Sequence, residues 1–387
     1  MKNTPPEPTR RHWLEPWHVD PSANREYDFI DGLRGVAILM VLACHYLYCQ
    51  ESQNPVIHFL RNFSGSLGSG VALFFTLSGF LISWPFWKRK VARSGSLIPP
   101  GYGWRRFWKI YPPLALSILL LTPCFILWKG HAPLFLRAAA QWLTGLAFLW
   151  PVSGQLNPVM WSLVVEIHFY LVLPLLFLLT KPMSAKTCLW VISLFLFAVP
   201  TLIQFTTGLG PSFSPEISDP FCTGLGSFCL GVCLAGVDNL KLWNRRWGRL
   251  GEAGWFIALA GLLGMAWAWM EPDGRGFFVQ QLFRWVFLLG SGCLLCYAAD
   301  PQNPRARWLT VPWLRWCGII SYEWYLFHQP MVFWSRDYFG PANGNVAHYL
   351  LNLCVPLAAS VALAAVVYRL FSLPLLKYGR AKKSAQK

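Results

Sequence analysis

Two ionisable side chains, Arg34 and His45, lie close to or within one apolar segment, residues 33–50. An ionisable group inside a membrane span costs at least ~2.5 kcal/mol, so each is a functional candidate. Eleven residues make three helical turns plus ~20°, which puts both side chains on one helix face, ~16 Å apart along the axis. A snorkelling arginine and a packing histidine are the structural alternative. Because Arg34 and His45 share one helix face, we favour a cavity that both side chains line.

Two more ionisable side chains stand in other apolar segments. Glu166 follows the start of one helix by about 7–8 Å, and His328 lies in the expected outer half of another. Both depths resemble that of His45. A carboxylate beside an imidazole raises its basicity, which suits a general base. We therefore predict that Arg34, His45, Glu166 and His328 form a catalytic set; a structural hydrogen-bond network is the alternative.

The eleven cysteines fall mostly inside apolar runs, which indicates packing thiols. Cys293 and Cys296 have the spacing of half a zinc or redox pair, but no second pair or nearby His-x-x-x-His completes it. We predict no metal site.

The composition identifies the kind of protein that must position these residues. Of 387 residues, 55% are hydrophobic, 16% are aromatic and only 13% are charged. This excludes a soluble enzyme, a disordered chain and a disulfide scaffold. It fits an all-α polytopic membrane protein, in which one span needs about 20 apolar residues and satisfies its own backbone hydrogen bonds.

Eleven apolar runs could cross a bilayer. They are residues 33–50, 68–87, 110–128, 134–150, 161–180, 186–206, 220–237, 252–270, 277–299, 313–336 and 346–371. The run 134–150 is the weakest, since it is short and contains Arg137 and Gln141. We predict about ten transmembrane helices plus one interfacial or re-entrant helix at 134–150.

The net charge of +16 indicates orientation in a membrane and not binding to nucleic acid, because Lys and Arg lie between apolar runs. Residues 88–109 hold seven of them, which predicts a cytoplasmic segment. The predicted loops 207–219 and 337–345 contain no Lys or Arg and should lie outside the cell. An even number of spans then puts both termini in the cytoplasm, with the lipid bilayer of the inner (plasma) membrane as partner.

Three regions follow from this pattern. Residues 1–27 are polar and read as a flexible cytoplasmic tail, without the features of a cleaved signal peptide. Residues 28–376 form the membrane domain, and residues 377–387 form a basic cytoplasmic tail.

Five blocks of the sequence resemble acyltransferase family 3, a family of integral membrane proteins. In order, they are Asp31-Gly32-Leu33-Arg34-Gly35 with His45; Leu73-Phe74-Phe75-Thr76-Leu77-Ser78-Gly79-Phe80; Arg105-Arg106-Phe107-Trp108-Lys109; Trp161-Ser162-Leu163 with Glu166; and Tyr322 to Pro330 with His328. Each block is weak alone, but together they cover nearly the whole chain.

The chain also departs from the family pattern. Where the family often has Arg-x-x-Arg, this chain has Arg106 and Lys109, and lysine lacks the bidentate fork of arginine. Ile167-His168 replaces a common Gln after the shared Glu. Phe371-Ser372-Leu373-Pro374 replaces a late Glu-Arg-Pro.

The resemblance implies transfer of an acyl group, most commonly acetyl, from cytoplasmic acyl-CoA to a hydroxyl of a cell-surface glycan or lipid-linked glycan. Arg105, Arg106 and Lys109 would then attract the polyanionic donor. Arg34 would position the donor and His45 would act as the general base. Ser78 as a covalent acyl carrier is an alternative. The oligomeric state stays open.

Two other functions fit the buried charges. A proton-coupled transporter or flippase would also use His and Glu inside spans, but no second copy of the Arg34/His45 segment indicates an internal repeat. A scaffold without catalysis would have no use for such expensive residues.

Overall fold

The computed structural model describes residues 28–47, 55–148, 156–208, 215–242, 247–268, 270, 276–299, 304–340 and 346–384. In these ranges all regular structure is helical, with no strand. The predicted all-α class is confirmed. The predicted N-terminal tail, residues 1–27, lies outside the described residues.

Fourteen α-helices run through the described ranges. They are α1 (Asp28–Tyr46), α2 (Pro55–Ser66), α3 (Gly70–Val91), α4 (Tyr102–Lys129), α5 (Ala132–Leu143), α6 (Trp161–Leu179), α7 (Ala185–Gly208), α8 (Pro215–Asn239), α9 (Trp247–Ala268), α10 (Gly276–Ala299), α11 (Pro312–Ile319), α12 (Ser321–Phe339), α13 (Val346–Val367) and α14 (Leu373–Ser384).

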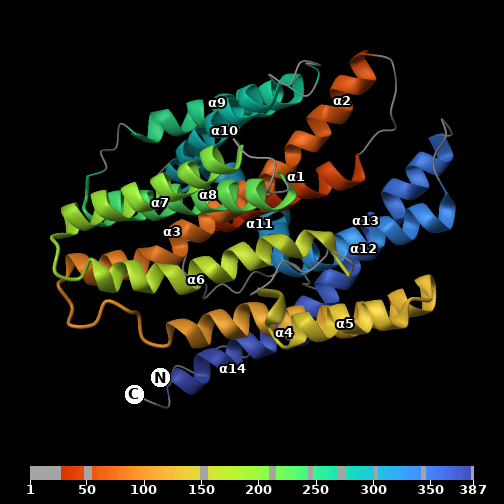
Figure 1. Cartoon of the computed structure of the whole chain (residues 1–387), viewed down its shortest axis with the longest axis horizontal. Coiled ribbons are helices and arrows are strands. Elements are labelled where there is room, and N and C mark those ends of the chain that lie inside the picture. Colours follow the sequence, from red (N-terminus) through yellow and green to blue (C-terminus); the bar gives the residue numbers. More distant parts are fainter. Residues whose placement is uncertain are drawn as a thin grey trace, which may run out of the picture.

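The helices pack as neighbouring pairs in one bundle (Figure 1). α3 lies against α8, α9 against α10, and α12 against α13. Figure 1 shows α9 and α10 along one edge of the bundle and α4, α5 and α14 along the opposite edge. α1 lies between these layers and contacts α3, α11 and α12. This arrangement lets α1, α3, α4, α6 and α12 enclose a common space.

Glycine allows a close crossing of α3 and α8 at Gly79. A Cβ atom added there would lie 2.3 Å from the carbonyl oxygen of Phe228, and one added to Gly231 would lie 2.1 Å from that of Thr76. Any side chain at either site would collide with backbone of the facing helix. These two glycines therefore set how closely α3 and α8 approach, a common device of membrane bundles.

Seven helical segments in the described part of the chain are long and apolar enough to cross a membrane. They comprise α1, α2 with α3, α4, α6 with the turn before it, α9, α10 and the run from α13 into α14. Large apolar side chains point outward from the bundle: Leu127 is 88% exposed and Trp190 is 78% exposed. A surface of this kind is stable against lipid tails but not against water. The chain is a multi-pass membrane protein.

The other three predicted spans correspond to α7, α8 and α12. The described apolar parts of α7 and α8 are shorter than a full span. α12 is not among the seven segments, and it carries Glu323, Arg336 and Asp337. Its polar residues face other helices and reduce its mean hydropathy.

The helices of the structure differ from the sequence prediction in three places. The predicted run 313–336 is two helices, α11 and α12, which meet at Ile320. The short amphipathic helix α2 was not predicted. α14 extends past residue 376 to Ser384, so helix continues into the predicted C-terminal tail.

The weakest predicted run, 134–150, contains most of the 12-residue helix α5 and the 3-10 turn Leu146–Phe148 before the described residues stop at 148. Twelve residues span about 18 Å, well short of a hydrocarbon core of about 30 Å. α5 packs against α4. Its length supports the predicted interfacial or re-entrant position.

Candidate functional site

A cavity of about 350 Å³ lies where α1, α3, α4, α6 and α12 meet, and we call it the central cavity. Its walls include Arg34, Arg106, Lys109 and Glu166, four residues that the sequence predicted as functional. Apolar side chains of α3, such as Leu77 and Leu81, form another wall. The space therefore joins a cationic region to an apolar slot.

Two guanidinium groups of the central cavity have a nitrogen atom without an acceptor among the described residues. Arg34 donates from Nη2 to the Ser321 hydroxyl at 3.1 Å. The Nε atoms of Arg34 and Arg106 are both buried, and neither has an acceptor in the described part of the chain. An N–H group buried without a partner costs about 1–3 kcal/mol, more when charged. The two unpartnered atoms indicate room for an anionic ligand.

Aromatic rings hold Arg106 in place. Its guanidinium carbon lies 5.9 Å from the Tyr102 ring centre and 5.6 Å from that of Tyr170, within the range of cation–π attraction. Arg106 and Lys109 lie three residues apart on α4, so they share one helix face. That face is the one turned to the cavity.

Glu166 lies among these cations and not beside a histidine. It accepts a hydrogen bond from the Tyr170 hydroxyl. It is also close enough to Lys109 for electrostatic attraction. Among the contacts of the described residues, none joins Glu166 to His45 or His328. The carboxylate of Glu166 thus lies where it partly balances the cations of the cavity, and its predicted role beside an imidazole stays a prediction.

The two predicted histidines come together from opposite ends of the chain. The ring centres of His45 on α1 and His328 on α12 are 5.1 Å apart, with the ring planes tilted by 49°. His328 is fully buried, whereas His45 is partly exposed. Arg336 donates from Nη2 to the backbone oxygen of His45 at 3.2 Å, which ties α12 to the end of α1.

The hydrogen bonds of His328 determine its tautomer. Its Nδ1 lies 2.8 Å from the carbonyl oxygen of Tyr325, which can only accept, so neutral His328 carries its proton on Nδ1. Its Nε2 then has a free lone pair, and this atom is buried without a partner among the described residues. The pair of imidazoles thus contains one nitrogen fixed as a hydrogen-bond acceptor.

Tyr325 connects the histidine pair to the central cavity. Its side chain lines the cavity, and its ring centre lies 5.6 Å from that of His328. Its hydroxyl donates to the Val159 carbonyl at 2.8 Å and accepts from Ser162 at 2.8 Å. The histidines themselves do not line the central cavity.

The structure thus places Arg34, Arg106, Lys109 and Glu166 around the central cavity, pairs His45 with His328 outside its lining, and leaves Arg105 apart from both groups. Arg105 points away from the cavity and donates to the backbone carbonyl of Pro100. Ser78, considered as an acyl carrier, does line the cavity. Sequence reasoning missed Ser321 and Tyr325. The spacing of Tyr325, three residues before His328 on one helix, was a signal for the latter.

Comparison with known proteins gives one family and several relatives. The sequence profile of a family described as acyltransferase domain matches residues 27–369. The chain is 24% identical to the O-acetyltransferase OatA of Staphylococcus aureus over 90% of its own length and 57% of that protein. It is 26% identical to the peptidoglycan O-acetyltransferase OatA of Listeria monocytogenes over 90% of its length and 56% of that protein.

A third relative is the acyltransferase MdmB of Streptomyces mycarofaciens, 29% identical over 42% of each chain. The chain spans little more than half the length of the OatA relatives. No solved structure matches it.

Proposed function

The chain belongs to this family of membrane acyltransferases, and from that membership we propose that it transfers an acyl group, acetyl in the first instance, from acyl-CoA to a hydroxyl of a cell-envelope glycan. The names of two relatives support O-acetyl transfer, and one of them, a peptidoglycan O-acetyltransferase, supports an envelope glycan as acceptor. Family membership also favours transfer over the transporter or flippase alternative.

The observation that carries the proposal is the unbalanced cationic wall of the central cavity. Arg34, Arg106 and Lys109 face Glu166 and Asp31 there, and two guanidinium Nε atoms lack acceptors in the described chain. The phosphates of a CoA ester would supply such acceptors through charge-assisted hydrogen bonds. The apolar wall of α3 suits the uncharged thioester arm.

The transfer itself needs a base, because a hydroxyl is a weak nucleophile at neutral pH. In our proposal His45 takes the proton as the acceptor oxygen attacks the thioester carbonyl. The new C–O bond forms, the C–S bond breaks, and His45 returns the proton to the CoA sulfur. The products are the O-acyl glycan and free CoA.

His45 suits this role better than His328 because of exposure. A base must touch the acceptor, and His328 is fully buried while His45 is partly accessible. We propose that His328 is a positioning residue, whose basic Nε2 stabilises the protonated form of His45. Arg34 would hold the donor.

The orientation in the membrane is part of the proposal. The cluster of Lys and Arg in residues 88–109 favours a cytoplasmic position for the connection between α3 and α4. Arg106 and Lys109 lie in the first two turns of α4, directly after this connection. A donor approaching from the cytoplasm would meet them first.

Cysteine labelling tests this orientation. In intact cells, Ser94→Cys should resist a membrane-impermeant thiol reagent and react after permeabilisation, whereas Ser212→Cys in the predicted external segment should react directly. Position 212 lies outside the described residues. The parent protein, with its native cysteines, gives the background. Direct labelling of Ser94→Cys would invert the proposed topology.

Mass spectrometry of envelope glycans tests the function. Cells that lack the gene should lose a mass of one acyl group from a glycan, and expression of the wild-type chain should restore it. The size of the mass difference identifies the acyl group. Identical glycan masses with and without the gene would contradict the proposed function.

A further inference from the structure

A second cavity, which we call the upper cavity, is larger than the central one. It has a volume of about 510 Å³, within the range of small-molecule sites. It is bounded by α2, the start of α3, the start of α6, and by α8, α9 and α10. Apart from α3 and α6, these helices take no part in the central cavity. Nothing above assigns it a role.

The two cavities lie end to end along α3. Residues from Ser69 to Phe75 line the upper cavity, and residues from Val71 to Ile82 line the central one. Val71 and Phe75 line both. The ring of Phe75 lies between them and meets the ring of Trp161 edge-on at 6.3 Å. Two aromatic side chains are thus placed where the cavities adjoin.

The upper cavity lies far from the basic connection between α3 and α4. It is lined by residues in the first turns of α3, whereas the connection follows Val91, the last residue of α3. The 22 residues of α3 cover about 33 Å, roughly the thickness of a hydrocarbon core. With residues 88–109 in the cytoplasm, the upper cavity faces the outer side.

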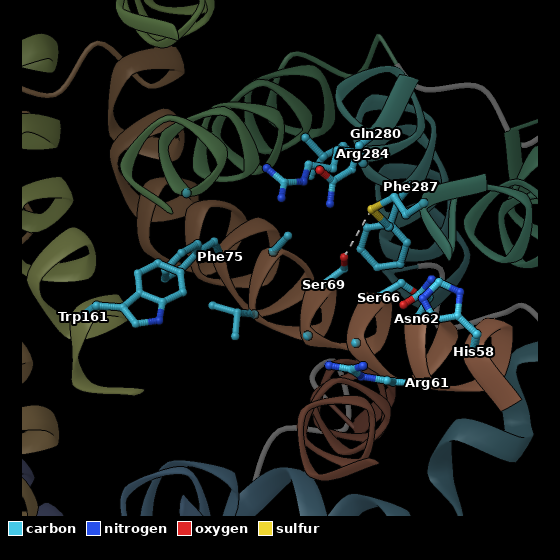
Figure 2. Close-up of a pocket in the computed structure, with 17 residues that line it drawn as sticks. His58, Arg61, Asn62, Ser66, Ser69, Phe75, Trp161, Gln280, Arg284 and Phe287 are labelled. Carbon is cyan, nitrogen blue, oxygen red and sulfur yellow. Dashed lines mark hydrogen bonds between the residues drawn. The ribbon is translucent and has the colours of Figure 1, made fainter. Parts of the chain in front are cut away.

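The upper cavity has a mainly apolar lining that also carries polar and positively charged side chains (Figure 2). Arg61 from α2 and Arg284 from α10 stand on opposite sides of the space, with Gln280 beside Arg284. The lining residues in the described chain include no aspartate or glutamate. Asn62 adds an Nδ2 donor that is buried without an acceptor in the described residues. Such a wall favours an anionic ligand with many oxygen atoms.

Aromatic residues stand at the ends of the same space. Figure 2 shows Trp161 and Phe75 at one end and Phe287 with His58 at the other. Flat aromatic rings can stack on the C–H face of a sugar ring, while amide, hydroxyl and guanidinium groups can hydrogen-bond to its hydroxyl groups. Phosphate alone would have no use for the aromatic rings.

We propose that the upper cavity is the acceptor site and binds a sugar that carries an anionic group, with Arg61 and Arg284 holding the carboxylate or phosphate. This deepens the proposed function and rests on it: the donor occupies the central cavity, and the acceptor occupies the upper cavity, which adjoins it at Phe75.

Binding of two matched probes tests the site without requiring turnover. 4-Nitrophenyl β-D-glucuronide and 4-nitrophenyl β-D-glucoside differ only at C6, where the glucuronide carries a carboxylate and the glucoside a hydroxymethyl group. Saturation-transfer NMR on the full chain in phosphatidylcholine nanodiscs detects weak binding of either sugar. We expect the glucuronide to bind about tenfold better, as charge-assisted contacts imply. Equal signals from both sugars, or none from the glucuronide, would overturn the proposal.

Variants assign the preference to the cavity. The double variant Arg61→Gln/Arg284→Gln should lose the preference for the glucuronide, and Arg61→Lys/Arg284→Lys should keep most of it. Arg137→Gln, on the exposed surface of α5, is the matched control and should behave as wild type. Each single glutamine variant should lose part of the preference for the glucuronide. If the double variant does not fold, these single variants test the site.

Transfer assays separate the site from the function. If wild-type protein binds the glucuronide but moves no labelled acetyl from acetyl-CoA to envelope glycan, the proposed function fails and the anion site stands. If transfer proceeds with the same acceptor KM in the glutamine double variant, the site fails and the function stands. Displacement of the glucuronide by phosphatidylglycerol at low mole fraction would assign the cavity to a lipid headgroup and overturn a sugar site.

Discussion

Replacement of His45 by alanine is expected to lower acyl transfer by about 10²–10⁴-fold, the usual cost of removing a positioned general base. His45→Gln should fail equally, because an amide can hydrogen-bond but cannot take up a proton. Both proteins should insert normally, since His45 is partly exposed at the end of α1 and contributes little packing. The measurement is turnover with labelled acetyl-CoA, per amount of inserted protein.

Two other histidines make this result specific. His168 lies in α6, lines neither cavity and has its Nδ1 2.7 Å from the Val164 carbonyl, so His168→Ala should keep most activity. His328→Ala should lower kcat less than His45→Ala and change the pH dependence of the remaining activity, because His328 acts through His45. If His328→Ala abolishes transfer while His45→Ala stays near wild type, the base lies on α12.

Removal of the two α4 cations is expected to raise the apparent KM for acyl-CoA by about 10²-fold or more. Arg106→Ala/Lys109→Ala deletes two charged contacts, each of which contributes about 1.5–3 kcal/mol in a buried site. The acceptor KM should change little, since both residues line only the central cavity. Initial rates over a range of donor concentrations, at fixed acceptor, measure the effect.

Arg105 is the control for this experiment because it is the sequence neighbour of Arg106 but faces elsewhere. Its guanidinium binds the Pro100 carbonyl and lines neither cavity. Arg105→Ala should therefore raise the donor KM by no more than about fivefold, the scale of a partly exposed charge. A donor KM that is unchanged in Arg106→Ala/Lys109→Ala would refute phosphate binding at this wall.

Most of the helices could be predicted from the sequence because a bilayer leaves so few alternatives. Each span must be apolar over about 20 residues and must satisfy its own backbone hydrogen bonds. An apolar run therefore predicts both a helix and its location in the bilayer. Boundaries were less certain, and α11 and α12 read as one run because a break at Ile320 leaves no change in hydropathy.

Sequence alone determined which residues are expensive enough to be functional. Arg34 and Glu166 stand out because a charge in an apolar helix needs a reason, and both line one cavity. Helix periodicity also indicates which residues of one segment share a face, as for Arg106 and Lys109.

Only the tertiary structure decided which groups meet across helices. Helical spacing gives the depth of a residue in the membrane but not the neighbour that it faces, because that depends on how whole helices are arranged around the bundle. Depth suggested that Glu166 should serve His45, and packing places beside His45 the ring of His328, 283 positions later in the chain. The same packing turns Arg105 away and builds the upper cavity from six helices, none of which would form it alone.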